Sequence, residues 1–288
     1  MRIRVTFVSA NPIPESLIAM VPHPVRVDRG ERRCGRFVSI FAHHDDPTLL
    51  REALRAVAGK VAVGVIEGPL AGEPARLLML DVDSTLTTTE AIDLLAEHAG
   101  LGERVAEITE RAMRGELDFG ESLAERVSTL EGLPTSVFAE VGPQMTLSAG
   151  ARELIATART VGARVGVTSG GFTQLVGPLA SSLGLDFFNA NQLETRTTEG
   201  VEVLTGRVIG QVVDRDQKAR DLLSFAHRHG IDPAYTAVIG DGANDLGMFA
   251  AAGISVAYCA KPVTAAAADV SIPFPALDAA GPFVFPFA

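Results

Sequence analysis

The 288-residue chain has only two cysteines and no long apolar run. Cys34 and Cys259 lie far apart and form no CxxC pair, so the sequence indicates neither a zinc site nor a disulfide framework. No apolar run approaches the length of about 20 residues that a membrane-spanning helix needs. The first apolar stretch ends at Asn11-Pro12, too early for a signal peptide, so we expect a cytoplasmic protein with reduced thiols.

Positive charge is also scarce. The chain has 25 Lys and Arg residues against 35 Asp and Glu, which gives a formal net charge of −10. Because nucleic acids and anionic membranes bind through positive charge, we expect neither as a partner. The composition, 47% hydrophobic and 21% charged, is typical of a globular protein that buries a sizeable core. An anionic substrate would need a local lysine, arginine or metal ion.

Residues 1–75 are predicted to form a small α+β module. Apolar patterning predicts three strands, at 3–8, 36–42 and 61–66. Helical spacing predicts a helix at Pro47–Ala58, with four residues on its apolar side: Leu49, Leu50, Leu54 and Val57. Gly72-Glu73-Pro74 is the expected linker to the rest of the chain.

Residues 76–288 are predicted to form an α/β domain. Short apolar runs alternate with helical stretches such as 217–229, which is typical of a parallel sheet with helices on both faces. The strands that we expect are 77–80, 164–168, 237–239, 254–257 and 270–272. Helical patterns within about 90–143, at Glu103–Arg114 and Phe119–Leu130, predict a cap inserted after the first of these strands, where it would act as a lid. The tail from Pro282 to Ala288 is expected to dock on the core.

The chain is organised around the end of the strand at 77–80, where Asp81 and Asp83 follow four apolar residues. Ligands of open α/β sheets bind at the carboxyl ends of the strands, and both carboxylates would lie on one side if the strand continued. Two carboxylates this close are unfavourable unless a proton or a cation neutralises one of them. Mg²⁺, a hard cation that prefers oxygen ligands, fits best. The alternative is a turn in which one Asp caps a helix.

Three further positions follow the same logic. Ser169 and Gly170, in Thr-Ser-Gly-Gly, offer a hydroxyl and a backbone N–H to an anion, although such turns are also common without a ligand. Lys218 lies four residues before Leu222 on the core-facing side of its helix, where its ammonium would neutralise a phosphate oxygen. In Gly-Asp-Gly-Ala-Asn-Asp, Asp241 is a candidate metal ligand, and Asp245 either caps the next helix or orients metal-bound water.

Taken in order, these motifs resemble the four-motif series of haloacid-dehalogenase-type phosphatases, and in detail those that act on phosphoserine. The similarity runs from about Leu77 to Ile272 and includes Arg111–Phe119 in the lid and Tyr258–Pro262. The resemblance implies a Rossmann-like parallel sheet with a small helical cap. It also implies hydrolysis of O-phospho-L-serine to L-serine and phosphate through an aspartyl-phosphate, the last step of serine biosynthesis.

The resemblance further implies a role for each motif residue. Asp81 would attack phosphorus, and Asp83 would protonate the leaving serine and then deprotonate the attacking water. Mg²⁺ would be held by the Asp81 carboxylate, the Asp83 backbone carbonyl and Asp241, with Asp245 behind them. The phosphoryl group would contact four residues: Ser169, Gly170, Lys218 and Asn244.

The serine end of the substrate would be recognised by Glu90 and Arg126, with Met113 and Phe119 closing the pocket. Each has an alternative reading. Glu90 fits a helix capping box with Thr87. Arg126 flanks the buried face of its helix, where it would either grip a carboxylate or be solvated at the lid edge. Met113 and Phe119 would otherwise be plain core residues.

Outside the motifs, residues 1–75 loosely resemble the amino-acid-binding ACT modules of some relatives, with Asn11-Pro12 where those carry a glycine-containing loop. Serine feedback and homodimerisation through this segment are both hypotheses. Two other functions remain open. One is a phosphatase or phosphotransferase of the same superfamily acting on a different small phosphomonoester. The other is an amino-acid-sensing regulatory protein with a vestigial phosphatase core.

Overall fold

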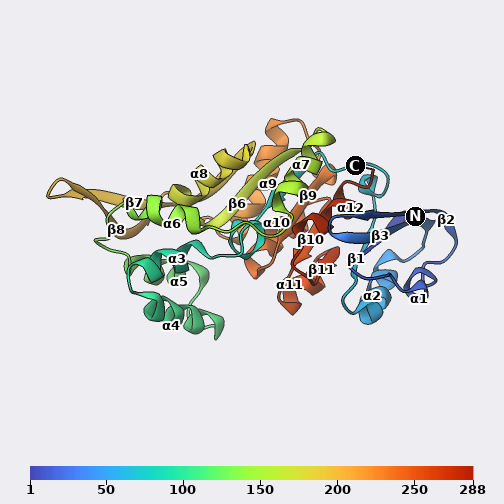
Figure 1. Ribbon diagram of the computed structural model, residues 1–288, viewed down its shortest axis with the longest axis horizontal. Coiled ribbons are helices and arrows are strands. Elements are labelled where there is room, and N and C mark those ends of the chain that lie inside the picture. The colour runs from blue at the N-terminus through green and yellow to red at the C-terminus, as the bar shows by residue number, and fades with distance from the viewer. Residues whose placement is uncertain (288) are drawn as a thin grey trace.

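One sheet of eleven strands runs through the molecule in the order β2-β3-β1-β4-β11-β10-β9-β5-β6-β7-β8 (Figure 1). The computed structural model describes residues 1–287, apart from the side chain of Met113. The strands from β11 to β7 pair in parallel, whereas the strands at both ends of the sheet pair antiparallel. Within the described chain, no helix has the length and apolar character to cross a membrane.

The parallel centre confirms the five strands that the sequence predicts. They are β5 (Leu77–Leu80), β6 (Arg164–Phe172), β9 (Thr236–Gly240), β10 (Ile254–Tyr258) and β11 (Val270–Ile272). Alternate residues of β5 join different apolar clusters on the two faces: Leu78 and Leu80 on one, Leu77 and Met79 on the other. Both faces are therefore covered, which is why β5 is apolar throughout.

Helices cover both faces, as predicted. They are α7 (Ala151–Thr160), α8 (Thr173–Leu183), α9 (Arg215–Arg228), α10 (Leu246–Ala251) and α11 (Pro262–Ala267). The C-terminal tail packs against α7 and β1 through a 3₁₀ turn and α12 (Gly281–Val284), and Phe283 and Phe285 are fully buried. The prediction that the tail docks on the core is confirmed for the described residues.

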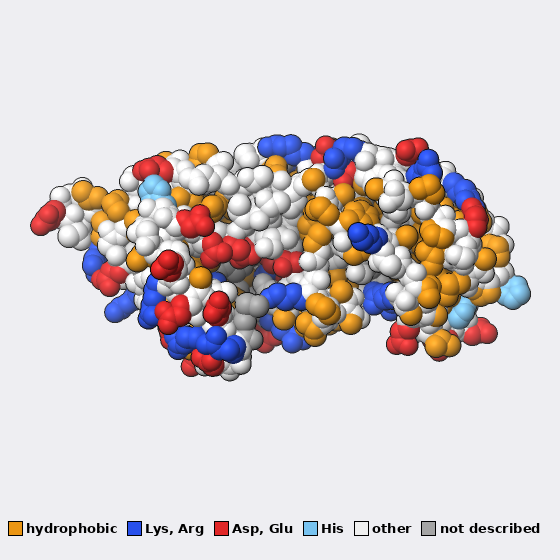
Figure 2. All heavy atoms as spheres, turned by 60° about the horizontal axis from the view of Figure 1, so that its bottom comes forward, with side chains coloured by type: hydrophobic (Ala, Val, Ile, Leu, Met, Phe, Trp, Pro, Cys, Tyr) orange, Lys and Arg blue, Asp and Glu red, His pale blue; other side chains and the backbone are white. Residues whose placement is uncertain are grey.

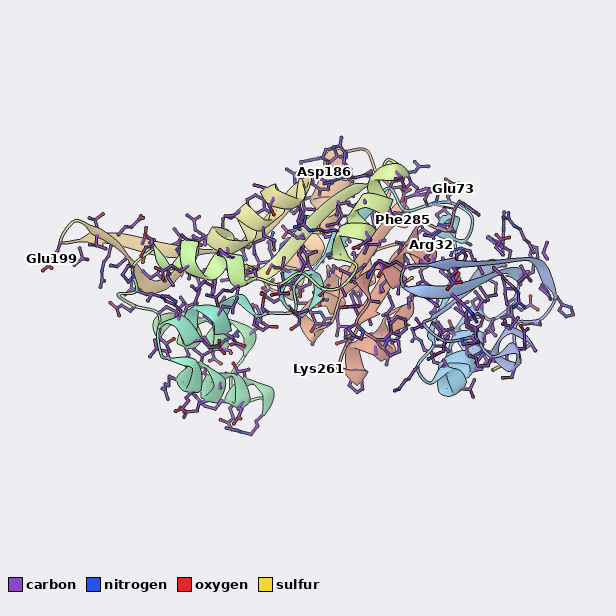
Figure 3. The ribbon with its side chains drawn as sticks, in the orientation of Figure 1. Arg32, Glu73, Asp186, Glu199, Lys261 and Phe285 are labelled. Atoms are coloured by element: carbon purple, nitrogen blue, oxygen red, sulfur yellow. The ribbon has the colours of Figure 1, made fainter. Side chains whose placement is uncertain are left out.

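The sequence analysis missed a long hairpin, β7 (Phe187–Thr198) and β8 (Val201–Ile209). The hairpin projects from one end of the sheet and turns at Glu199 and Gly200, both in the left-handed region (Figures 1 and 3). Its outer half is exposed, so its sequence lacks the apolar alternation by which a half-buried strand is recognised.

The cap follows β5 and contains four helices: α3 (Ala91–His98), α4 (Gly102–Met113), α5 (Phe119–Ser128) and α6 (Val137–Val141). Their apolar residues Val105, Ile108 and Leu123 are buried. The segment after α5 pairs with β8, since Gly132 N–H donates to the Leu204 carbonyl at 2.9 Å. The β7–β8 hairpin, which the sequence analysis missed, is therefore in direct hydrogen-bonded contact with the cap.

The N-terminal unit contains the predicted strands and helix: β1 (Arg2–Ser9), β3 (Gly35–His43), α2 (Pro47–Ala58) and β4 (Ala62–Ile66). A short helix α1 (Glu15–Ile18) and an edge strand β2 (Pro24–Arg32) were missed, the latter because most of it is exposed. The apolar side of α2 is narrower than expected. Leu50 and Leu54 are buried, but Leu49 and Val57 are 60% and 57% exposed, because α2 covers the sheet with one narrow face.

The N-terminal unit extends the central sheet. Its strand β4 pairs antiparallel with β11, through Gly64 opposite Val270. Arg4 of β1 is fully buried and donates hydrogen bonds to four backbone carbonyls, those of Leu70, Ala71, Pro282 and Phe283, at 2.7–3.3 Å. These bonds connect the first strand, the segment before β5 and the C-terminal tail at one point.

Candidate active site

The loop after β5 turns sharply instead of continuing the strand. Asp83 is extended (φ −64°, ψ 132°), but Ser84 adopts a left-handed conformation with φ 56°. The strand geometry therefore does not continue beyond Asp81. Asp81 and Asp83 nevertheless line one cavity of about 420 Å³, between the loops at the sheet edge and the cap. Figure 2 shows acidic side chains gathered around this recess.

Lys218 is fully buried beside Asp81 and does not itself line the cavity among the described residues. Its Nζ is 2.8 Å from Asp81 Oδ1 and 2.7 Å from Asp245 Oδ1. Burial lowers the pKa of Lys218, but the two carboxylates outweigh it and hold this pKa above its usual value. The lysine is therefore charged and fixes one oxygen of Asp81, to which Val82 N–H also donates at 2.7 Å. Burial, reinforced by Asp245, raises the pKa of Asp81.

Asp245 holds the loop that carries Asp241. Its Oδ2 accepts hydrogen bonds from the N–H groups of Asp241 and Gly242, at 3.1 and 3.0 Å. A Cβ on Gly240 would lie 2.2 Å from the same oxygen, so the carboxylate needs a glycine there. Asp245 stands at the N-cap position of α10, as one alternative predicted, but its side chain makes no capping bond to that helix.

One oxygen each of Asp81, Asp241 and Asp245 lie within 4.8 Å of one another, an arrangement that could hold a metal ion. Both oxygens of Asp245 are engaged by Lys218 and the loop N–H groups. Asp81 Oδ2 and Asp241 Oδ2 accept no hydrogen bond from the described residues. Burial raises the pKa of Asp241 to about 6, even though Thr85 donates to its Oδ1 at 2.9 Å. A hard divalent cation would compensate these buried charges, so the donor set fits one.

Asp83 has a different environment. Burial, and next the charge of Glu90, raise the pKa of Asp83 to about 7. Its Oδ1 accepts a hydrogen bond from Ala91 N–H at 2.9 Å, and its Oδ2 lies 3.4 Å from Ser169 Oγ. A carboxyl group with a pKa near neutrality can both give and take a proton at physiological pH. The geometry therefore suits Asp83 for proton transfer.

The anion-binding loop lies at the end of β6. Ser169 is fully buried, and its Oγ accepts a hydrogen bond from Gly171 N–H at 2.9 Å. Gly170 lines the cavity, and a Cβ placed on it would lie 3.4 Å from Cζ of Phe119. The aromatic ring of the cap thus packs over this loop. Phe119 is 36% exposed, so the reading of a plain core residue is wrong.

The cap side of the cavity carries Glu90 and Arg126. Glu90 Oε1 accepts a hydrogen bond from Ser84 Oγ at 2.6 Å, which explains the left-handed turn at Ser84. Burial lowers the pKa of Arg126, an effect that Glu90 opposes. Among the described residues, its guanidinium makes one hydrogen bond, from Nε to the Ser122 carbonyl at 3.3 Å, and no carboxylate forms an ion pair with it. The arginine is therefore available to an anionic ligand.

The capping box at the start of α3 is absent. Thr87 donates to the carbonyls of Val82 and Thr89, and the Glu90 side chain makes no capping bond. Asp83 takes the place of the cap by accepting from Ala91 N–H. Met113 lies in α4, but its side chain falls outside the described part of the structure.

Two residues that hold the site together, Thr85 and Asn191, were not singled out in the sequence. Thr85 binds Asp241, and Asn191 on β7 contacts the Gly170 carbonyl at 2.8 Å. Asn244 lines the cavity as expected. Lys261, in the resembling stretch at 258–262, also lines it and lies on the cap side of the sheet (Figure 3). A chain pattern cannot reveal such contacts, because they join strands that are distant in sequence.

Together these groups form a site for phosphoryl transfer. A carboxylate fixed by an ammonium, a proton carrier with a pKa near 7, an anion-binding loop and a cation site share one cavity. This is the equipment that positioning and electrostatic stabilisation of a transferred phosphoryl group require.

Comparison with known proteins agrees with that class. The family model of haloacid dehalogenase-like hydrolases matches residues 78–250, more than half of the chain. The chain therefore belongs to the haloacid dehalogenase-like hydrolase family.

Several similar proteins are phosphoserine phosphatases. The chain is 48% identical over 231 residues to a phosphoserine phosphatase of Mycobacterium tuberculosis, covering 80% of this chain and 56% of that protein. It is 48% identical over 205 residues to that of Streptococcus thermophilus, covering 71% and 94%. A solved phospho-aspartyl intermediate analogue of a phosphoserine phosphatase is 38% identical with a TM-score of 0.67, covering 74% and 100%. The chain thus spans only about half the length of the first of these relatives.

Proposed function

We propose that this protein hydrolyses O-phospho-L-serine to L-serine and phosphate through an aspartyl-phosphate on Asp81, the cytoplasmic last step of serine biosynthesis. One observation carries the proposal. A single cavity presents Asp81 and Asp83 from the sheet and Glu90 and Arg126 from the cap side. The similarity to phosphoserine phosphatases, one of them solved as a phospho-aspartyl intermediate analogue, supports it.

In the first step, an oxygen of Asp81 attacks phosphorus while the phosphorus–oxygen bond to serine breaks. Asp83, protonated because its pKa is about 7, gives its proton to the departing serine oxygen. Lys218, Ser169 and the Gly170 N–H stabilise the phosphoryl oxygens, on which negative charge is spread in the transition state. Asn244, which lines the cavity, contacts the same group.

In the second step, Asp83 is a carboxylate and removes a proton from the water that attacks the phosphoryl group. The bond from phosphorus to Asp81 breaks, inorganic phosphate leaves, and Asp81 returns to its carboxylate form. Asp83 ends the cycle protonated again, so one residue serves as acid and then as base. A pKa near 7 suits both steps, since each form is well populated at neutral pH.

Mg²⁺ is the proposed cofactor. Asp81 and Asp241 would hold it through their free carboxylate oxygens, together with the backbone carbonyl of Asp83, while Asp245 keeps the Asp241 loop in place. When bound, the ion neutralises charge on the phosphoryl group and on the buried carboxylates. The raised pKa values of Asp81 and Asp241 support a cation here. They show that buried negative charge at this position is unfavourable, and a bound cation can replace the protons that would otherwise neutralise it.

At the serine end, Arg126 grips the substrate carboxylate and Glu90 accepts from the ammonium group. The guanidinium has five donors in a planar fork that matches a carboxylate. Phe119 covers the bound substrate from the cap, and Met113 does so by resemblance to the family. The cap thereby selects the leaving group, whereas the sheet performs the chemistry.

The second candidate is a different small phosphomonoester, favoured by the cavity volume of about 420 Å³, which is in the range that accommodates larger ligands than serine. Phosphate release from phosphoserine and from a panel of phosphomonoesters with Mg²⁺ decides between them, with Asp81→Asn as the control. A strong preference for phosphoserine supports the proposal. Turnover of another compound would keep the mechanism and replace the substrate, and no turnover would favour a sensor with a vestigial core.

For residues 1–75 we propose a distinct module that binds a free amino acid or pairs with a second copy of the chain. The ACT resemblance supports the first role and the exposed edge strand β2 the second. Calorimetry of the full chain with L-serine, in an Asp81→Asn and Arg126→Ala background, separates binding in this module from binding in the active site. Sedimentation velocity of the full chain tests pairing.

A further inference from the structure

Asn191 of β7 is fully buried beside the anion-binding loop. Its Nδ2 donates to the Gly170 carbonyl at 2.8 Å, and its Oδ1 accepts from Val213 N–H at 2.9 Å. Because one partner is an acceptor and the other a donor, only one orientation of the amide satisfies both. The side chain therefore connects two segments that lie more than 40 residues apart in sequence.

The first segment is the loop that would bind phosphate. Register between β6 and β7 shifts after Ser169, so Gly170 and Gly171 take no part in the strand ladder. The peptide between these glycines is held at both ends instead. Its carbonyl accepts from Asn191, and its N–H donates to Ser169 Oγ at 2.9 Å. Since Ser169 Oγ already accepts this bond, its own proton is left for Asp83 or for a phosphoryl oxygen.

The second segment is the start of α9, which carries Lys218. Val213 is buried and precedes Asp214, whose side chain caps the helix by accepting from Gln217 N–H at 2.7 Å. Lys218 N–H donates to the Asp214 carbonyl at 3.0 Å, in the first turn. The position of Val213 thus sets where the helix begins and where the lysine points.

We propose that Asn191 is a positioning residue that holds the Ser169–Gly171 loop and the start of α9 in fixed relation, so that both grip the same phosphoryl group. This inference rests on the proposed function, in which Ser169, Gly170 and Lys218 contact phosphate. Asn191 itself does not line the cavity among the described residues. It acts through a chain of hydrogen bonds that polarise one another and direct the Ser169 proton toward the ligand.

The test compares two variants of similar size with a matched control. Asn191→Leu removes both hydrogen bonds, and Asn191→Asp keeps the acceptor for Val213 but loses the donor to Gly170. Asn189→Leu is the control, because Asn189 lies two residues earlier on the same face of β7 and its amide binds Asp221 instead, at 2.8 Å. Unfolding temperature, kcat for phosphoserine, and the dissociation constant of inorganic phosphate with Mg²⁺ are measured for each.

Both Asn191 variants are expected to lower kcat by about 10- to 100-fold, the loss typical of a small misplacement of reacting groups. They should also weaken the binding of inorganic phosphate by a similar factor, whereas their binding of L-serine at the cap should stay near the wild-type value. The kcat of Asn189→Leu should also stay near the wild-type value. Wild-type kcat and phosphate affinity in both Asn191 variants would overturn the proposal. An equal loss of affinity for phosphate and for serine would also overturn the proposal, since it would indicate that the whole active site is disturbed.

Two further outcomes remain interpretable. If Asn191→Leu does not fold, Asn191→Ser, which leaves room for water, takes its place in the same measurements. If the wild-type protein does not hydrolyse phosphoserine, the proposed function fails, but the phosphate dissociation constants still decide whether Asn191 positions the loop.

Discussion

Asp81 and Asp83 are chemically identical and two residues apart, yet their surroundings give them different properties. Asp81 faces the Lys218 ammonium at 2.8 Å, and Asp83 faces Glu90 and has a pKa of about 7. In the proposed mechanism, this difference in environment separates a nucleophile from a proton carrier, a separation on which acid–base enzymes commonly rely. The sequence indicated both aspartates because they follow an apolar strand, but it could not show which neighbours each would have.

Lys218→Met removes the one ammonium that, among the described residues, forms ion pairs with Asp81 and Asp245. We expect kcat to fall by about 100- to 1,000-fold, the usual cost of losing one stabilising group at a developing charge. Breaking a buried ion pair also lowers the free energy of unfolding, by about 3–5 kcal/mol. Steady-state kinetics and urea unfolding measure both.

Lys60→Met is the control, because Lys60 is exposed on the N-terminal unit. A Lys218 variant with wild-type stability in the absence of metal would contradict the ion-pair argument, since the two carboxylates would then tolerate burial alone.

Arg126→Ala should reduce kcat/KM for phosphoserine by about 10- to 100-fold, since hydrogen bonds to charged groups contribute about 1.5–3 kcal/mol. Inorganic phosphate should bind as in the wild type, because it lacks the carboxylate. Arg111→Ala is a matched control in the cap, where Arg111 is paired with Glu125 at 2.6 Å. An unchanged kcat/KM in the Arg126 variant would remove the serine assignment.

At the scale of elements, patterning predicted those that are apolar on at least one face. The central strands and the cap helices were found for this reason. Strand β2 and the outer half of β7–β8 are largely exposed, and their extended conformation comes from pairing with neighbours. Helix α2 was placed correctly, but Leu49 shows that spacing cannot tell how wide a face the fold will cover.

The β7–β8 hairpin should determine the position of helix α5 in the cap. A Cβ on Gly206 of β8 would lie 3.1 Å from Glu131 Cβ and 3.2 Å from the Ser128 carbonyl oxygen, next to α5. Gly206→Ala should therefore displace α5 and raise KM for phosphoserine several-fold, with little change in inorganic phosphate binding. Kinetics and phosphate calorimetry check this.

Gly200→Ala is the matched control for that experiment. Its φ of 80° is close to the 77° of Gly206, so the backbone strain is similar, but no atom lies within 4 Å of the added Cβ. If both variants changed KM equally, strain in the hairpin would be the cause and the contact with the cap would not.

At the scale of the whole molecule, the buried carboxylates link metal binding, pH and stability. Asp83 and Asp241, with pKa values of about 7 and 6, keep protons in the folded protein that an unfolded chain releases near pH 4. The folded state thus binds more protons, and the stability that these groups contribute is lost as pH rises through 6 and 7. The loss amounts to about 1.4 kcal/mol for each pH unit and group.

We therefore expect Mg²⁺ to raise the unfolding temperature more at pH 7.5 than at pH 5, because a cation replaces protons that are already present at low pH. Thermal unfolding with and without the ion at both pH values measures the difference. The Asp241→Asn variant should show a smaller difference between the two pH values in the rise of unfolding temperature that Mg²⁺ causes. Equal stabilisation by Mg²⁺ at both pH values would show that these carboxyl groups do not bind the ion.

The pairing of β4 with β11 has a consequence for the timing of synthesis. A ribosome makes Ile66 long before Val270, and at about 5–20 residues per second the interval is roughly 10–40 s. Throughout that time the β11 side of β4 has no partner, and an open strand edge invites pairing with other chains. The carbonyls of Pro282 and Phe283, which accept from Arg4, emerge later still. The nascent N-terminal unit should therefore need protection by chaperones until the last segment of the chain arrives.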